Sequence, residues 1–90
     1  MAEAEATRVA SALNDWLRTL TPAEILADGA VSVAEASRII GVSVGTGLKL
    51  IARGALPYTI IGFSRRVPRV ALVRYLELGL EIARELREAS

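Results

Sequence analysis

The strongest constraint on the fold is a pair of short helices that the sequence encodes within residues 32–54, each with its own start and stop signal. Ser32 can cap the first helix, and Gly41 can end it in the left-handed conformation that glycine favours. Ser43 can cap the second helix, and Gly54 can end it. A turn of about three residues joins the two helices, which is typical of a helix-turn-helix unit.

Local patterns also predict how this pair is built and which face it buries. Glu35 is expected to complete a capping box with Ser32, and the second helix is expected from Val44 to Arg53. The apolar residues expected to face inward are Ala36, Ile39, Ile40, Leu50 and Ile51. Many purely structural helix pairs share this pattern, so a function needs further signals.

The residues after the pair predict a β-hairpin. Residues 56–61 are rich in β-forming side chains, residues 62–64 supply a turn, and residues 65–67 can return as a second strand that ends at Pro68. A hairpin directly after a helix-turn-helix unit is a wing. The expected fold class is therefore mainly α, a winged helix-turn-helix with a small two-stranded β-hairpin and extra helices at both ends.

Helices are expected on both sides of this unit. An apolar stripe predicts one from Glu3 to Leu20, and a capping box at Thr21 predicts a short one over residues 22–27. A last helix is expected from Arg69 to Ala89. It carries two apolar lines, one through Leu72, Leu76, Leu80 and Ala83 and the other through Tyr75, Leu78, Ile82 and Leu86. A small domain usually buries one such line, so the second predicts contact with another chain or with the first helix.

The length of the chain and its share of apolar residues limit the number of domains and indicate the assembly. We expect one domain over residues 1–90, made of an N-terminal helical extension (1–30), the helix-turn-helix unit with its wing (31–68) and a C-terminal helix (69–90). Apolar residues make up 52% of the chain, which is rich for so small a core and suggests a partner that shares the burial. A homodimer or a cooperative homo-oligomer is the expected assembly.

The distribution of charge points to a polyanionic partner. The net charge is only +1, but residues 36–76 hold seven basic side chains and no acidic one, while the rest of the chain holds ten acidic side chains. A cationic middle between acidic ends is typical of a surface that faces nucleic acid.

The sequence lacks the residues that several classes of function require. The chain has no Cys and no His, which removes thiolate and imidazole metal sites and the nucleophile–base pairs built on them. We find no phosphate-binding loop, no carboxylate pair in an apolar setting and no cofactor motif, so neither an enzyme nor a cofactor is expected. The N-terminus has acids where a secretory signal has bases, and no apolar run approaches the roughly 18 residues of a membrane span. We therefore expect a cytoplasmic protein without a membrane partner.

Four consecutive stretches resemble one known family. "VAEASRIIGVS", "VGTGLKLIARG", "ALP" and "IIGFSRRVPRVAL" follow, without gaps from Val31 to about Leu76, the pattern of the excisionase-type DNA-binding proteins, small winged-helix relatives of the MerR-type regulators. The resemblance implies binding to double-stranded DNA, several adjacent sites, DNA bending, and a phage or mobile element whose integrase or recombinase is directed toward excision.

The chain departs from the family pattern where the family reads bases. Val44, Gly45 and Gly47 stand in place of polar, basic or β-branched residues, Ala52 replaces a basic residue, and Phe63 with Ser64 replaces two arginines at the wing tip. Direct base readers are therefore partly missing, and specificity would come from DNA shape or from a partner protein.

The two glycines at the start of the second helix need an explanation, because each weakens a helix by about 1 kcal/mol relative to alanine. In one interpretation, Gly45 and Gly47 let backbone N–H groups approach a phosphate closely, where the positive end of the helix dipole also favours the anion. In the other, Gly47 only makes room for the preceding helix.

The candidate DNA-binding residues are Arg38, Ser43, Val44, Gly45, Thr46, Lys49, Arg53, Arg65 and Arg66. Ser43 is first a helix cap, Thr46 lies on the side where the family reads bases, and Lys49 is the central charge of its helix. Arg53 can instead neutralise the helix dipole, and Arg38 can instead be a solvated surface residue. Arg65 and Arg66 are adjacent on a strand and so must point to opposite faces. The role of Phe63 stays open between a protein partner and the minor groove.

Three functions remain open at this point. The first is an excisionase-type architectural factor that binds tandem direct repeats. The second is a transcriptional regulator, a repressor on the same scaffold that dimerises through its terminal helices and binds an inverted repeat. The third is a protein-interaction adaptor that does not bind DNA.

Overall fold

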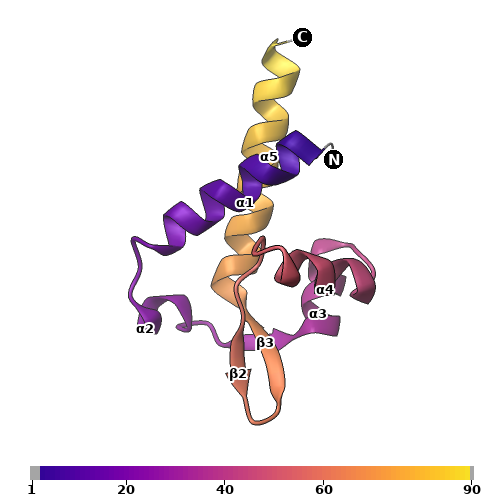
Figure 1. Cartoon of the computed structure of the whole chain (residues 1–90). Coiled ribbons are helices and arrows are strands. Elements are labelled where there is room, and N and C mark those ends of the chain that lie inside the picture. The colour runs from indigo at the N-terminus through magenta and orange to yellow at the C-terminus, as the bar shows by residue number, and fades with distance from the viewer. Residues whose placement is uncertain (1–2, 90) are drawn as a thin grey trace.

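The computed structural model describes residues 3–89, which form five helices and three strands (Figure 1). In chain order the elements are α1 (Glu3–Leu17), α2 (Pro22–Ile25), β1 (Ala30–Ser32), α3 (Val33–Ile40), α4 (Val44–Ala52), β2 (Thr59–Ile61), β3 (Ser64–Pro68) and α5 (Arg69–Ala89). The mainly helical winged fold expected from the sequence is confirmed. No helix within residues 3–89 combines the length and the apolar character needed to cross a bilayer.

The sheet has one strand more than the sequence predicted. Its three antiparallel strands lie in the order β1-β3-β2, with Val31 opposite Val67 and Ile60 opposite Arg65. The expectation of a two-stranded hairpin was therefore incomplete. β1 escapes sequence analysis because three residues are too few to show an alternating pattern, and its last residue also serves as the cap of α3.

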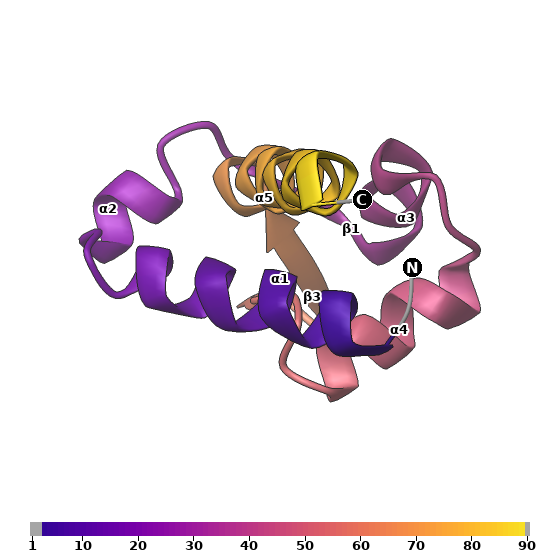
Figure 2. The ribbon, with the colours of Figure 1, turned by 90° about the horizontal axis from the view of Figure 1, so that it is seen from above.

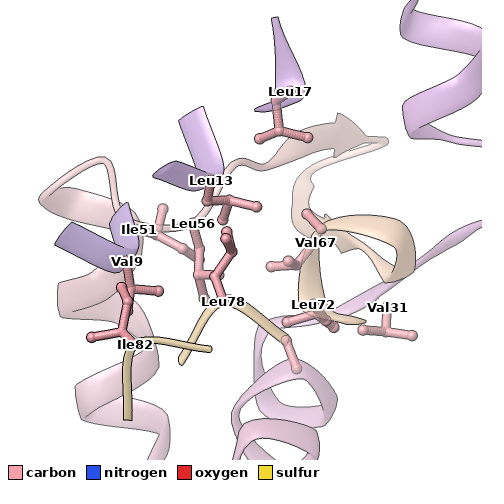
Figure 3. Packing of buried hydrophobic residues seen from close by; sticks show 12 residues of the cluster. Val9, Leu13, Leu17, Val31, Ile51, Leu56, Val67, Leu72, Leu78 and Ile82 are labelled. Atoms are coloured by element: carbon pink, nitrogen blue, oxygen red, sulfur yellow. The ribbon is translucent and has the colours of Figure 1, made fainter. Parts of the chain in front are cut away.

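The core lies where α1 crosses α5 above the sheet (Figures 1 and 3). Val9 and Leu13 of α1, Val67 of β3 and Leu72 of α5 are fully buried or nearly so, and Ile51 of α4 packs into the same cluster. Each such aliphatic side chain contributes about 1.5–3 kcal/mol through burial. The core thus ties the N-terminal extension to the helix-turn-helix unit in a single cluster.

Hydroxyl caps start three of the helices as expected. Thr21 and Glu24 form a complete capping box, with the Glu24 amide donating to Thr21 Oγ1 (3.1 Å) and the Thr21 amide donating to Glu24 Oε1 (2.9 Å). These hydrogen bonds, that of the Thr21 amide first, lower the pKa of Glu24. At α3 only half of the predicted box forms: Ser32 Oγ accepts from the Glu35 amide, while the Glu35 carboxylate pairs with Arg38 (3.2 Å).

Three helix ends and one side chain differ from the sequence prediction, the smallest difference being that α4 ends at Ala52 rather than Arg53. α1 stops at Leu17, because the amides of Thr19 and Leu20 bond three residues back rather than four. α2 ends at Ile25 rather than Ala27. Ile39, expected to face inward, is 38% exposed, since the side of α3 that meets α4 carries Ser37 instead.

Candidate nucleic-acid interface

The turn between α3 and α4 has the geometry that its caps predict. Gly41 ends α3 with φ +81°, and Ser43 begins α4, where its Oγ accepts from the Thr46 amide (3.2 Å) and donates to Thr46 Oγ1 (3.1 Å). The cap role of Ser43 is confirmed. Its hydroxyl and that of Thr46 thus hold the first turn of α4 together.

Gly47 is a packing residue. It is buried against α3, and a Cβ added there would overlap Ser37 Oγ and lie 3.2 Å from Ser37 Cβ. Ser37 is itself 1% exposed and donates its hydroxyl to the Val33 carbonyl (2.8 Å). The packing explanation is therefore confirmed for Gly47, and the idea that it approaches a phosphate is wrong because α3 covers it.

Gly45 lies on the opposite, exposed side of α4. The nearest atom that an added Cβ would meet is Ser43 Oγ, at 3.9 Å, so nothing in residues 3–89 requires a glycine here for packing. Close approach of a ligand to the backbone remains a prediction for Gly45.

The outward face of α4 is mostly apolar. Val44 is 47% exposed and Leu48 is 44% exposed, and they flank Gly45 and Lys49 on the same face. Sequence reasoning missed Leu48, although its position four residues after Val44 places the two on one side of a helix. Thr46 and Arg53 are exposed as well, so hydrogen-bonding side chains are few on this helix.

The wing carries its two arginines on opposite faces, as expected. Arg65 lies opposite Ile60, and its guanidinium stacks over the Tyr58 ring at 5.6 Å from the centroid. Arg66 lies opposite Thr59 on one side and Ser32 of β1 on the other. Because β1 also flanks β3, Arg66 is half-buried between two strands while Arg65 is exposed.

The tip of the wing is a two-residue turn with an exposed aromatic ring. Gly62 has φ +62°, which suits the first central position of a tight hairpin turn, and Phe63 occupies the second. Phe63 is fully exposed, and Ile61 beside it is largely exposed.

Two of the seven basic residues in the acid-free stretch are neutralised by acids from outside it. Arg38 pairs with Glu35 (3.2 Å). Arg74 stacks on Trp16 at 5.5 Å from the ring centroid and reaches Glu81 Oε1 at 3.5 Å. No carboxylate in residues 3–89 forms an ion pair with the remaining five, Lys49, Arg53, Arg65, Arg66 and Arg69.

The unpaired cations belong to elements at one end of the molecule. Figure 1 shows α4 and the β2–β3 hairpin at the end opposite the C-terminal half of α5. Arg53 sits at the edge of this region: it ends α4 beside the start of α1, where Glu3, Thr7 and Leu50 line the same shallow groove. Asn14 Nδ2 fixes this junction by donating to the Gly54 carbonyl (3.0 Å).

Comparison with known proteins agrees with this geometry. A family model described as a helix-turn-helix domain matches residues 30–77, more than half of the 90-residue chain. The matched range begins with β1, contains α3, α4 and the wing, and ends within α5. No curated protein and no solved structure gives a significant match. The chain therefore belongs to the helix-turn-helix domain family, and this domain supports binding to double-stranded DNA.

Proposed function

We propose that this chain acts on double-stranded DNA by occupying and shaping it, without catalysis, as an excisionase-type architectural protein. The observation that carries the proposal is the character of the DNA-facing elements. α4, its C-cap and the wing hold four of the five unpaired cations, while the outward face of α4 carries mainly Val44, Gly45 and Leu48. Such a surface favours phosphate contacts and DNA shape over direct base readout.

The arrangement suggests how the contacts divide. α4 enters the major groove, where Thr46 can hydrogen-bond to a base edge and the methyl groups of Val44 and Leu48 can contact thymine methyls. Lys49 and Arg53 meet phosphates. The β2–β3 wing follows the neighbouring backbone with Arg66 or Arg65, and only one of the two faces the duplex.

A binding and bending experiment tests this proposal. The full chain is titrated onto a generic duplex at several salt concentrations, and bending is measured with circularly permuted fragments. Affinity should fall steeply with salt, and the double variant Lys49→Ala/Arg66→Ala should lower the salt slope by about two. A double variant that binds like wild type would overturn the assigned surface, and an absence of any salt-dependent binding would favour the adaptor function.

A transcriptional regulator on the same scaffold is the second candidate. The observation that favours it is an apolar face of α5 that no other described element covers. A protein that dimerises about a two-fold axis binds inverted repeats, whereas an architectural array uses direct repeats. Selection of bound sequences from a random duplex pool separates the two, because the recovered sites report both spacing and orientation.

A further inference from the structure

α5 has two apolar faces, and only one of them is used inside the protein. Leu78 and Ile82 are buried toward α1. On the opposite side Val73 is 58% exposed, Leu76 44% and Leu80 55%. Figure 2, in which α5 is seen end-on, shows α1 on one side of it and no helix over the side turned away from α1.

The exposed residues are spaced as the seam of a helix pair. Val73, Leu76, Leu80 and Ala83 follow one another at intervals of three, four and three residues, which keeps them on one line along the helix. The small residues Ala83, in this line, and Gly79, beside it, allow a second helix to come close.

The charges at the edge of this seam select both the partner and its direction. Glu77 and Arg84 flank the same side of the line, two helical turns apart, and both are exposed; within the chain Glu77 has only a long, solvent-exposed contact with Arg74, at 3.9 Å. If a second copy of α5 runs antiparallel, Glu77 of each copy lies beside Arg84 of the other, which forms two equal ion pairs about an axis near Leu80. In a parallel pair each edge of the seam faces the opposite edge of its partner, so Glu77 and Arg84 would lie beside uncharged residues such as Gly79 and gain no ion pair.

We propose that this α5 seam, Val73, Leu76, Leu80 and Ala83 with Glu77 and Arg84 at its edge, binds a second copy of the chain in an antiparallel, two-fold arrangement. Leu80 of each copy then meets its equivalent near the axis, and Leu76 lies nearest Ala83 of the other copy.

Two other acids of α5 already have basic partners within the chain. Glu85 accepts from Arg8 of α1 (2.6 Å), and Glu81 lies 3.5 Å from Arg74. The C-terminal half of α5 also projects beyond the rest of the molecule (Figure 1). An antiparallel pair about an axis near Leu80, at the middle of α5, places the two helix-turn-helix units toward opposite ends of the dimer.

This inference rests on the proposed DNA binding only for its consequence, which is that a dimer presents its two units to DNA in inverted orientation, the layout that the second candidate function requires. The dimer itself is tested without DNA, by sedimentation equilibrium of the full chain at micromolar concentrations. Wild type should be a dimer and Leu80→Glu a monomer. Ile60→Glu, a matched change at an exposed apolar residue of the wing, should leave the dimer intact.

A charge exchange tests the direction of the pairing. Glu77→Arg alone and Arg84→Glu alone should each weaken the dimer, on the order of fivefold, because each puts like charges together. The double variant should restore the wild-type dissociation constant. Circular dichroism confirms that each variant is folded, which is expected because all the changed side chains are exposed.

The outcomes separate this inference from the proposed function. A wild-type monomer, a Leu80→Glu dimer, or a double variant that fails to recover would each overturn the α5 seam. Lys49→Ala/Arg66→Ala should still dimerise, and Leu80→Glu should still bind a single DNA site with salt dependence. Loss of DNA binding with the dimer retained contradicts the function alone, and loss of the dimer with DNA binding retained contradicts the seam alone.

Discussion

At the scale of single residues, two glycines of α4 that lie only two positions apart differ in their surroundings. Gly47 is packed against α3, whereas Gly45 is exposed. α3 and α4 approach so closely that Gly47 has Ser37 where a methyl group would be, whereas Gly45 has open space. Both glycines carry the same intrinsic cost to a helix. The structure therefore supplies a compensating packing gain at Gly47 and, within residues 3–89, none at Gly45.

We expect Gly47→Ala to destabilise the protein by about 1–3 kcal/mol, because the new methyl group overpacks the α3–α4 contact and outweighs the gain in helix propensity. Ser37→Ala combined with Gly47→Ala should recover part of the loss, since it removes the hydroxyl oxygen that the methyl group would overlap. Urea unfolding followed by circular dichroism measures both. A single variant as stable as wild type would mean that the two helices separate without cost.

Gly45→Ala should have the opposite effect on stability and a distinct effect on DNA. The free energy of unfolding should rise by up to about 1 kcal/mol, because an exposed helical glycine is replaced by the best helix former. Affinity for duplex DNA should fall if the backbone contacts a phosphate. Thermal melting and fluorescence anisotropy give the two values, and an affinity that is kept or improved rules out close approach at this position.

At the scale of elements, Lys49 of α4 has no ion pair with a described carboxylate, whereas Arg38 of α3 pairs with Glu35. Lys49→Ala should weaken binding about equally on all sequences and lower the salt slope by about one, since one phosphate contact is lost. Arg38→Ala is the matched control, because Arg38 is already paired with Glu35. Gel shifts across a salt series compare the two, and an equal loss in both variants would show that α3 faces the duplex as much as α4.

The capping box of α2 should leave a signature in pH. Its hydrogen bonds lower the pKa of Glu24 in the folded state, so the stabilisation is present above the ordinary glutamate range and is lost as the pH falls through the folded-state pKa. Thr21→Ala should raise this pKa only part of the way, because the backbone amide of residue 21 remains as the larger cause. Titration of the Glu24 carboxyl carbon by NMR measures the difference.

At the scale of the whole molecule, the features predicted correctly from sequence are those decided within one helical turn. The caps at Thr21, Ser32 and Ser43 are local hydrogen bonds, so the residues themselves place them. β1 was missed because its pairing depends on Val67, far along the chain. The charge pattern was only partly informative: Arg74 stacks on Trp16, which is far away in sequence, and it also reaches Glu81, which the helical period places two turns along the same face of α5.

The candidate DNA-binding residues show the same difference between features set by local sequence and features set by distant contacts. Lys49, Thr46 and Gly45 share the exposed side of one helix, which its period already fixes. Leu48 belongs with them, but its apolar side chain was not considered as a contact. The orientation of the wing relative to α4 depends on the whole core, so the choice between Arg65 and Arg66 could not be made from the pattern of residues.

The hydrogen bond from Asn14 to the Gly54 carbonyl attaches α1 to the loop that follows α4. α1 crosses α5 (Figures 1 and 2), and this bond ties the C-terminal half of α1 to the loop after α4. α1 therefore links the helix that would join two copies to the helix that would contact DNA. Loss of this hydrogen bond would leave DNA binding and dimerisation intact, but the distance between the two α4 helices of a dimer would no longer be set by the α5 contact.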